Sequence, residues 1–247
     1  MTRLRAITLG AFALAAVGCV DNGGDKALLI LHNQVPDENC VISADEGGLF
    51  QDEGLLDVLG GTGYLFTPLV KNTAAASTTN EGVRTAFVLG ARVSVRFPDK
   101  TLFSQAELDS LSKTGVTRFE IPLSGAISPN GGAAPFSFDI VPSSLAQVLS
   151  DKLGNDPRKR ILMLADVTMR ADLGGGTSES NTFSYPVGAC AGCVIKNLGA
   201  CSSLPSGFMP AVGNPCNPFQ DGGTQCCTLA DQSLLCPAVS TGTGGGQ

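Results

Sequence analysis

The cysteines divide this 247-residue chain into two unlike parts. Seven of the nine cysteines lie between residues 190 and 236, among prolines and glycines rather than in an alternating apolar pattern. Such a segment cannot bury enough apolar surface to fold alone, and disulfides compensate by restricting its unfolded state. We therefore predict an irregular, disulfide-rich extension over residues 189–239, followed by a flexible tail over residues 240–247.

The first residues have the pattern of a secretion signal. Arg3 and Arg5 precede a short apolar run, Ala6–Val17, and small residues follow it. This order is typical of a signal peptide, whereas a membrane-spanning helix needs roughly 20 apolar residues. We predict that residues 1–18 are removed on export.

The end of this signal is similar to the lipobox of bacterial lipoproteins. Residues 16–19 read Ala-Val-Gly-Cys, and in lipoproteins a peptidase cuts before the acylated cysteine. We expect fatty acylation of Cys19 and a lipid-anchored tether over residues 19–25. The alternatives are a plain signal peptide cut after Ala15 and a retained membrane helix.

The parity of the cysteines favours the lipoprotein interpretation. Plain secretion would leave an odd thiol in an oxidising compartment, whereas acylation of Cys19 leaves an even set. We predict that the remaining cysteines form disulfides: Cys40, Cys190, Cys193, Cys201, Cys216, Cys226, Cys227 and Cys236. Complete pairing requires Cys40 to bond with a cysteine of the extension, although the connectivity stays open.

The charge balance narrows the set of partners. Without Arg3 and Arg5 the chain has 14 Lys and Arg against 22 Asp and Glu, a net charge of −8. This charge repels phosphate backbones and anionic headgroups, so we expect no nucleic-acid partner and membrane affinity through the lipid alone. Val20 follows Cys19 where an inner-membrane retention Asp could stand, which favours the outer membrane. The face, periplasmic or surface, stays open.

Strand signals dominate residues 26–188, which we predict to form the main domain. Apolar residues alternate with polar ones in several segments separated by turn residues. Within residues 161–171 the predicted inner face comprises Ile161, Met163, Ala165, Val167, Met169 and Ala171. The predicted strands are 27–35, 64–70, 91–97, 118–123, 136–141, 161–171 and 183–187. Pro122 suggests an edge strand or a strand end.

The apolar spacing predicts one helix, over Ser144–Leu153. Ser144 and Gln147 suit a capping box, and Gly154 suits the position after the last turn. Residues 105–112 are a candidate for a second, shorter helical turn. The predicted fold is therefore mainly β: a two-sheet antiparallel β-sandwich, immunoglobulin-like or similar to late-embryogenesis proteins, with one short helix and the extension.

Three groups of residues could carry chemistry. Cys190 and Cys193 have the C-x-x-C spacing of redox and zinc sites, but they follow a strand and enter a proline-rich stretch, which favours a structural disulfide. His32, the only histidine, lies in an apolar run and is expected to be a hydrogen-bonded structural residue. Nine acids could suggest calcium, but their spacing favours a solvated surface: Asp21, Asp25, Asp37, Glu38, Asp45, Glu46, Asp52, Glu53 and Asp57.

Several phrases of the chain resemble uncharacterised lipoproteins of myxobacteria and related deltaproteobacteria. The resemblance covers most of the mature sequence and rests on residues 64–70 with Asn72, 90–93, 122–125, 180–187, Cys190 with Cys193, and 220–221 ahead of Cys226-Cys227. It implies an envelope location but no particular activity. The Pro68-Leu69-Val70-x-Asn72 pattern is also similar to the sandwich of plant late-embryogenesis proteins, which is an analogy of fold alone.

These observations predict a non-enzymatic envelope lipoprotein that acts by binding a partner, such as another envelope protein, or as a structural module. We expect no cofactor, since the phosphate-loop, nucleophile-elbow and zinc-protease motifs are absent from the sequence. The alternatives are an exported enzyme, using either the C-x-x-C pair or carboxylates, and a calcium-stabilised adhesion module.

Overall fold

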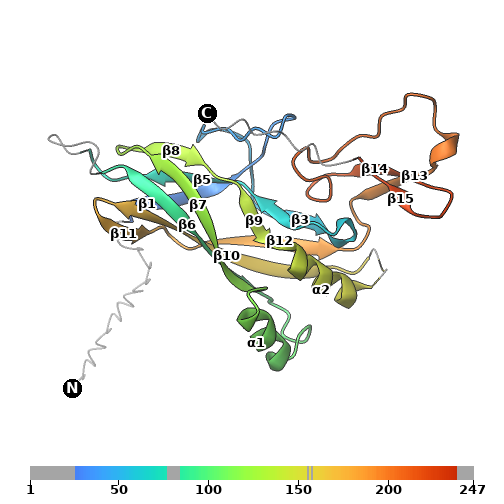
Figure 1. The fold of residues 1–247 in the computed structure, drawn as a ribbon, viewed down its shortest axis with the longest axis horizontal. Helices are drawn as coiled ribbons and strands as arrows, with labels where there is room; N and C mark the ends of the chain where they lie inside the picture. Colours follow the sequence, from blue (N-terminus) through green and yellow to red (C-terminus); the bar gives the residue numbers. More distant parts are fainter. Residues whose placement is uncertain (1–25, 77–83, 155, 157, 238–247) are drawn as a thin grey trace, which may run out of the picture.

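The computed structural model describes residues 26–76, 84–154, 156 and 158–237 (Figure 1). The predicted signal peptide, Cys19, the tether and the predicted tail lie outside these residues. The described chain is mainly β with several sheets, which confirms the predicted class. No helix within the described ranges has both the length and the apolar content needed to cross a membrane.

The largest sheet of the described residues has six strands. Its strands run in the order β3, β12, β10, β6, β7, and β11 pairs with β10 at one end. The bounds are β3 (Gly54–Asp57), β12 (Phe183–Cys190), β10 (Ile161–Leu173), β6 (Ala86–Arg96), β7 (Arg118–Ile127) and β11 (Gly176–Glu179). The six residues predicted as the inner face of β10 are all buried, so that prediction is confirmed. Pro122 lies in β7 at the end of the sheet, as its missing N–H group suggested.

Two smaller sheets accompany the large one. One has the order β2, β1, β5, β8, and the other pairs β4 with β9. The bounds are β1 (Leu28–Gln34), β2 (Phe50–Gln51), β4 (Tyr64–Phe66), β5 (Pro68–Asn72), β8 (Gly132–Pro135) and β9 (Phe138–Val141). The single strand predicted over 64–70 is therefore wrong. Thr67 separates β4 from β5, because its N–H and hydroxyl both donate to the buried Asn33 side chain, at 2.8 and 3.1 Å.

The pairing is not antiparallel throughout, contrary to expectation. Strand β3 pairs in parallel with β12, and β13 (Ile195–Ala200) pairs in parallel with β14 (Thr224–Thr228). Strand β3 reaches the edge of β12 directly after β2, which belongs to the four-stranded sheet, so no hairpin fixes its direction.

Two helices occur in the described residues, and the second, α1 (Gln105–Lys113), confirms the candidate helical turn over residues 105–112. Helix α2 (Ser143–Leu153) packs Leu145, Leu149 and Leu153 into the core and ends at Gly154, whose φ is 61°. Its predicted capping box is wrong, because the N-cap is Pro142 and no side chain caps it. The capping box belongs instead to helix α1 (Gln105–Lys113), where Ser104 and Glu107 bond reciprocally.

The extension leaves the end of β12 and lies beside β3 (Figure 1). It holds a three-stranded sheet of β13, β14 and β15 (Leu234–Leu235), so the prediction of an irregular segment is wrong in part. Two short 3-10 helices, η1 (Val58–Gly60) and η3 (Cys201–Ser203), complete the described elements. The strands of the extension escaped sequence analysis because buried cysteines occupy positions where an alternating pattern needs apolar residues.

Candidate functional site

The eight cysteines of the predicted disulfide set lie in four pairs at bonding distance. Cys40 meets Cys216 across 176 residues of sequence, with 5.0 Å between their Cα atoms. This pair links the loop after β1 to the extension, the kind of link that the even cysteine count requires. The other three pairs are Cys190–Cys193, Cys201–Cys227 and Cys226–Cys236. Formation of these four bonds in solution stays a prediction.

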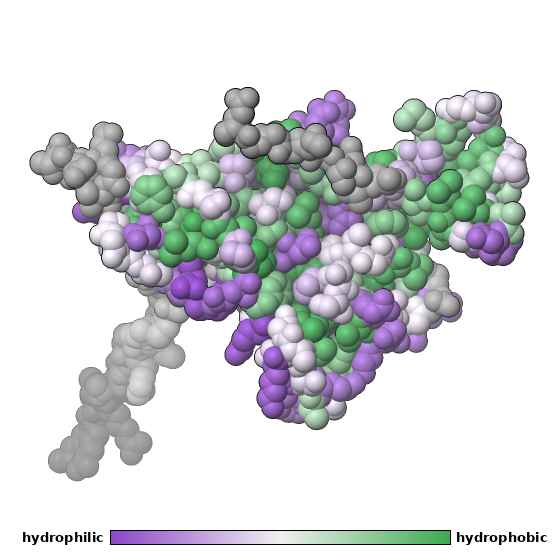
Figure 2. Space-filling view, viewed as in Figure 1, coloured by the Kyte–Doolittle hydropathy of each residue, from purple (hydrophilic) through white to green (hydrophobic). Residues whose placement is uncertain are grey.

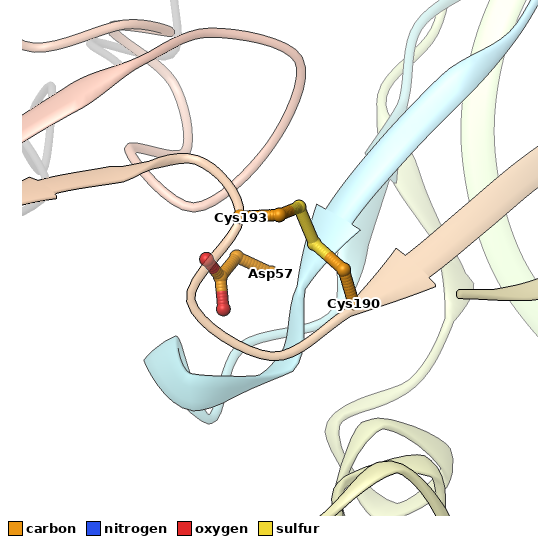
Figure 3. Close-up of side chains that lie close together, drawn as sticks. All are labelled: Asp57, Cys190 and Cys193. Atoms are coloured by element: carbon orange, nitrogen blue, oxygen red, sulfur yellow. A yellow bond between two sulfur atoms is a disulfide. The ribbon is translucent and has the colours of Figure 1, made fainter. Parts of the chain in front are cut away.

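The C-x-x-C loop is organised by a buried carboxylate (Figure 3). Asp57, the last residue of β3, accepts the backbone N–H groups of Gly192 at 2.8 Å and Val194 at 3.1 Å. It also accepts the N–H of Leu59 at 3.1 Å. The prediction that Asp57 is a solvated acid is wrong, because its exposed fraction is 0%. The loop leaves the sheet with unpaired amides, and this carboxylate satisfies them.

The same carboxylate weakens the zinc interpretation of the loop. Asp57, Cys190 and Cys193 bring one ligand atom each within 4.8 Å of one another, the only such group of three in the described ranges. Both oxygens of Asp57, however, already accept amide hydrogens, and the two sulfurs face each other. A structural zinc site needs four ligands with free lone pairs. The geometry therefore fits an anchored disulfide loop better than a metal centre.

A cation lies against the outer sulfur of the pair. Arg160, just before β10, places Nη1 3.2 Å from Cys193 Sγ. Cys193 is half-buried, whereas Cys190 is completely buried. A nearby guanidinium stabilises a thiolate, and a nearby carboxylate such as that of Asp57 opposes it. Chemically, this arrangement permits thiol–disulfide exchange at Cys193 without strongly promoting it.

A buried polar network ties the extension to the core. The Tyr64 hydroxyl lies 3.0 Å from the Tyr185 hydroxyl and donates to Asp221 Oδ2 at 2.9 Å. Asn33 donates to the Tyr185 oxygen at 3.0 Å, and the N–H of Leu55 donates to Asp221 Oδ1 at 2.8 Å. Aspartate and tyrosines of three separate segments therefore share one chain of hydrogen bonds.

Burial dominates the electrostatics of this network. It raises the pKa of Tyr185 to about 12 and that of Tyr64 further still, where the neighbouring Asp221 carboxylate adds to the effect. Burial also raises the pKa of Asp221 above that of an ordinary aspartate, although the hydrogen bonds from Leu55, Tyr64, Gln51 and Gln220 oppose the shift. Both tyrosines thus stay neutral, and Asp221 is held by donors on both of its oxygens.

Two amide side chains of the extension imitate strand pairing. Gln220 accepts the N–H of Leu65 at 2.8 Å and donates to the carbonyl of Leu65 at 3.0 Å. Asn217 donates to the carbonyl of Gly63 at 2.7 Å. These side chains pair with N–H and C=O groups of β4 and of its preceding turn that do not pair with β9.

A cleft of about 400 Å³ opens beside this junction, on the outer face of the large sheet. Its residues include Glu53, Leu55, Arg160, Leu162, Gly188 and Asp221. Gly188 pairs with Leu162 on one side and with Leu55 on the other. Because glycine has no side chain, the sheet surface is hollow between these two leucines. The missing side chain of Gly188 therefore contributes to the hollow of the cleft.

Asp21 and Asp25 lie outside the described residues, and no three of the other acids gather there as a calcium site would need. Asp37 and Asp45 accept amides of their own loop, and Glu46 forms an ion pair with Lys71 at 2.8 Å. His32 stacks on Phe50 with 5.1 Å between ring centroids, as a structural residue would. The expected hydrogen bonding is incomplete, however, since its Nε2 atom is buried without a partner among the described residues.

Sequence analysis missed Arg160, Asp221 and the Tyr64–Tyr185 pair as members of a site. Tyr64, Tyr185 and the Gln220-Asp221 dipeptide belonged only to the segments that carry the resemblance and were assigned no role. No spacing rule joins residues from β4, β12 and the extension, because only the folded sheet brings them together.

Comparison with known proteins adds little to this geometry. No protein-family model matches the chain, and no curated protein matches it either. Among solved structures, the chain is similar to one titled as a crystal structure of a protein from Archaeoglobus fulgidus, with 11% identity. The likeness covers 58% of this chain and 90% of that chain, and its TM-score of 0.31 is too low to carry an argument.

Proposed function

We propose that this chain is a lipid-anchored protein of the bacterial cell envelope that acts by binding, not by catalysis. In this proposal Cys19 carries the lipid at the outer membrane, residues 26–188 form a two-layer β-sandwich, and residues 189–239 form a stapled appendage. The resemblance to myxobacterial lipoproteins agrees with this assignment.

The observation that carries the proposal is the way the extension closes onto the body. The Cys40–Cys216 pair, the buried side chains of Asn217 and Gln220, and the half-buried Asp221 hold the extension against β3 and β4. Burying polar groups in such a junction costs free energy unless each group is hydrogen-bonded. The junction also borders a cleft on the sheet surface. The acidic group in the cleft wall, Asp221, has both oxygens occupied, which favours a positioning role over acid–base chemistry.

Mass spectrometry of the mature N-terminus tests the anchor. The wild-type protein should begin at Cys19 and carry fatty acyl mass, and it should partition with membranes. A Cys19→Ser variant should lose both properties, while a Cys40→Ser variant serves as a cysteine control that keeps the lipid. An unmodified thiol at Cys19, or a mature start at Ala16, contradicts the proposal.

Thiol–disulfide exchange is a second candidate function, favoured by the contact of Arg160 with Cys193. The reduced pair would transfer two electrons and two protons to a disulfide of a partner protein, forming the Cys190–Cys193 disulfide and two partner thiols. Titration of thiols under mild reductant tests it. A pair that opens before the other three supports exchange, and eight equally inert half-cystines oppose it.

A further inference from the structure

We propose that the cleft over Gly188 binds a short peptide with free termini, an extended ligand of about three residues. The inference rests on the proposed binding function and deepens it by naming the site and the chemical class of ligand.

The floor of the cleft is apolar and exposed. Leu162 has 52% of its surface exposed, although leucine on a sheet surface is more stable when covered. Leu55 and Pro186 continue the same floor on β3 and β12. A cleft of about 400 Å³ lies within the range of small-ligand sites, roughly 300–1,000 Å³. The apolar middle of a ligand would therefore cover Leu162.

Opposite charges stand at the two ends of this floor. Arg160 is exposed, and within the described ranges its guanidinium contacts a sulfur but no carboxylate. Glu53 is also exposed and also lacks an ion pair within those ranges. A terminal carboxylate suits Arg160, because guanidinium groups bind carboxylates with two hydrogen bonds. A terminal ammonium suits Glu53.

The sheet register sets the distance between these charges. Arg160 precedes β10, Glu53 precedes β3, and the two strands run in opposite directions on either side of β12. The two residues therefore lie diagonally across Gly188, with Cα atoms about 16 Å apart on an ideal sheet. Their side chains shorten this gap, so that an extended peptide of about three residues, about 10 Å long, fits between the charges.

Other ligands match these groups less well. A polyanion meets one arginine against Glu53, Asp221 and a net charge of −8 in the mature chain. A fatty acid satisfies Arg160 but leaves its apolar tail beside Glu53. A peptide with both termini free uses the floor and both ends.

Calorimetry with tripeptides of the form Ala-X-Ala, where X is each apolar residue, tests the proposal on the full mature chain in detergent. We expect binding by at least one member, and at least a tenfold loss for the same peptide with an amidated C-terminus. An Arg160→Ala variant should bind the acid and the amide equally, because the discrimination comes from Arg160. Glu53→Gln should likewise abolish discrimination against an acetylated N-terminus.

A cavity-filling variant tests the location of the site. A Cβ atom at Gly188 would lie 3.5 Å from Leu55 Cδ1, an ordinary contact, so Gly188→Val folds and fills the hollow. We expect it to weaken binding at least tenfold. Gly176→Val is the matched control, since nothing lies within 4 Å of a Cβ there and β11 is remote from the cleft.

Three results would overturn the inference: no tripeptide binding below about 1 mM, unchanged binding to Gly188→Val, or a preference for the free acid that survives in Arg160→Ala. Equal binding of decanoate would overturn the peptide class. The lipid at Cys19 is measured separately by mass, so failure of the cleft is distinguishable from failure of the proposed anchor.

Discussion

The body, residues 26–188, and the extension that follows it keep their strands together by different chemistry. The buried residues of the body are mostly aliphatic and aromatic, and they form one continuous core. The buried residues of the extension are mostly cysteines and uncharged polar side chains: Cys190, Asn214, Cys216, Asn217, Gln220, Thr224, Cys226 and Cys227. The body can therefore gain stability from apolar burial alone, whereas the extension depends on covalent links and on its contact with the body.

The surfaces of the two regions differ as well. The outer face of the large sheet in the body carries ion pairs, among them Arg96–Asp166 at 2.7 Å and Arg170–Glu120 at 3.1 Å. Between Lys196 and residue 237 the only charged residues are Asp221 and Asp231. Apolar side chains gather over the extension, at the right of the view in Figure 2, and the exposed ones include Phe208, Met209, Leu234 and Leu235. Salt and pH should act mainly on the body and on the junction.

The largest effect is expected from removing the covalent link between the two regions. In a Cys40→Ser, Cys216→Ser double variant the loss of a link across 176 residues should lower the free energy of unfolding by about 5 kcal/mol. Most of this loss should fall on the extension, whose docking depends on the link. Hydrogen exchange should rise in β13 to β15 while β10 stays protected. Equal loss of protection in β10 would mean that the two regions form one cooperative unit.

The next effect acts on the body alone. Phe66 is fully buried and packs against Phe138, Phe183 and Tyr185, with ring centroids 5.2 to 6.0 Å apart. Phe66→Ala should lower the free energy of unfolding by about 3–5 kcal/mol, because it removes a large side chain and leaves a cavity. Urea denaturation measures the loss. The exposed Phe87→Ala is the matched control and should change stability by less than about 1 kcal/mol.

The sequence predicts the body better than the extension for the same physical reason. Alternating apolar residues identified the inner face of β10 correctly, because burial on one face requires a period of two. This alternation could not reveal that Thr67 separates β4 from β5, because the cause is a hydrogen bond to Asn33, which is distant in sequence. In the extension the buried positions are cysteines and amides, so no apolar period exists there.

The candidate site was accessible to sequence analysis only through its cysteines. Cys190 and Cys193 were singled out by their spacing, but Asp57 was assigned to an acidic surface. Its burial depends on the amides of a loop 135 residues further along the chain. The missing side chain that contributes to the cleft is that of Gly188, a glycine that looks ordinary in sequence and becomes informative only between Leu55 and Leu162. Local patterns therefore locate strands, whereas the site is a product of register.

A smaller effect concerns the junction between the regions. Gln220→Ala should lower stability by about 1–3 kcal/mol, since it leaves the N–H and carbonyl of Leu65 without partners. Denaturation by urea, followed together with hydrogen exchange at Leu65, measures both the global and the local effect. Gln105→Ala, on the exposed helix α1, is the control and should be nearly neutral. A neutral Gln220→Ala variant would show that the amide does not hold the extension.

The same junction should respond to pH. Burial raises the pKa of Asp221 in the folded state above the ordinary value of 3.8, so between these two values the folded chain binds more protons than the unfolded chain. The contribution of Asp221 to stability is therefore greatest below pH 3.8 and falls as the pH rises through the folded-state pKa. The difference in unfolding free energy between wild type and Asp221→Asn should decrease over that window. A difference that is flat or increases with pH contradicts the assignment.

The smallest expected effect concerns an exposed ion pair on the surface of the body. The extension has no such pair among its described residues. Glu107 accepts Lys152 Nζ at 2.9 Å and the N–H of Ser104 at 2.7 Å, and these bonds lower its pKa to about 2. The helix-capping contribution of Glu107 should be present above an ordinary glutamate pKa of 4.5 and lost as the pH falls toward 2. Because the pair is exposed, 1 M salt should move the midpoint of the carboxyl titration, followed by NMR, back toward 4.5. Lys152→Met should move it the same way without salt, since the lysine bond is the main cause of the shift. A midpoint that salt and Lys152→Met both leave unchanged would assign the low pKa to the Ser104 cap alone.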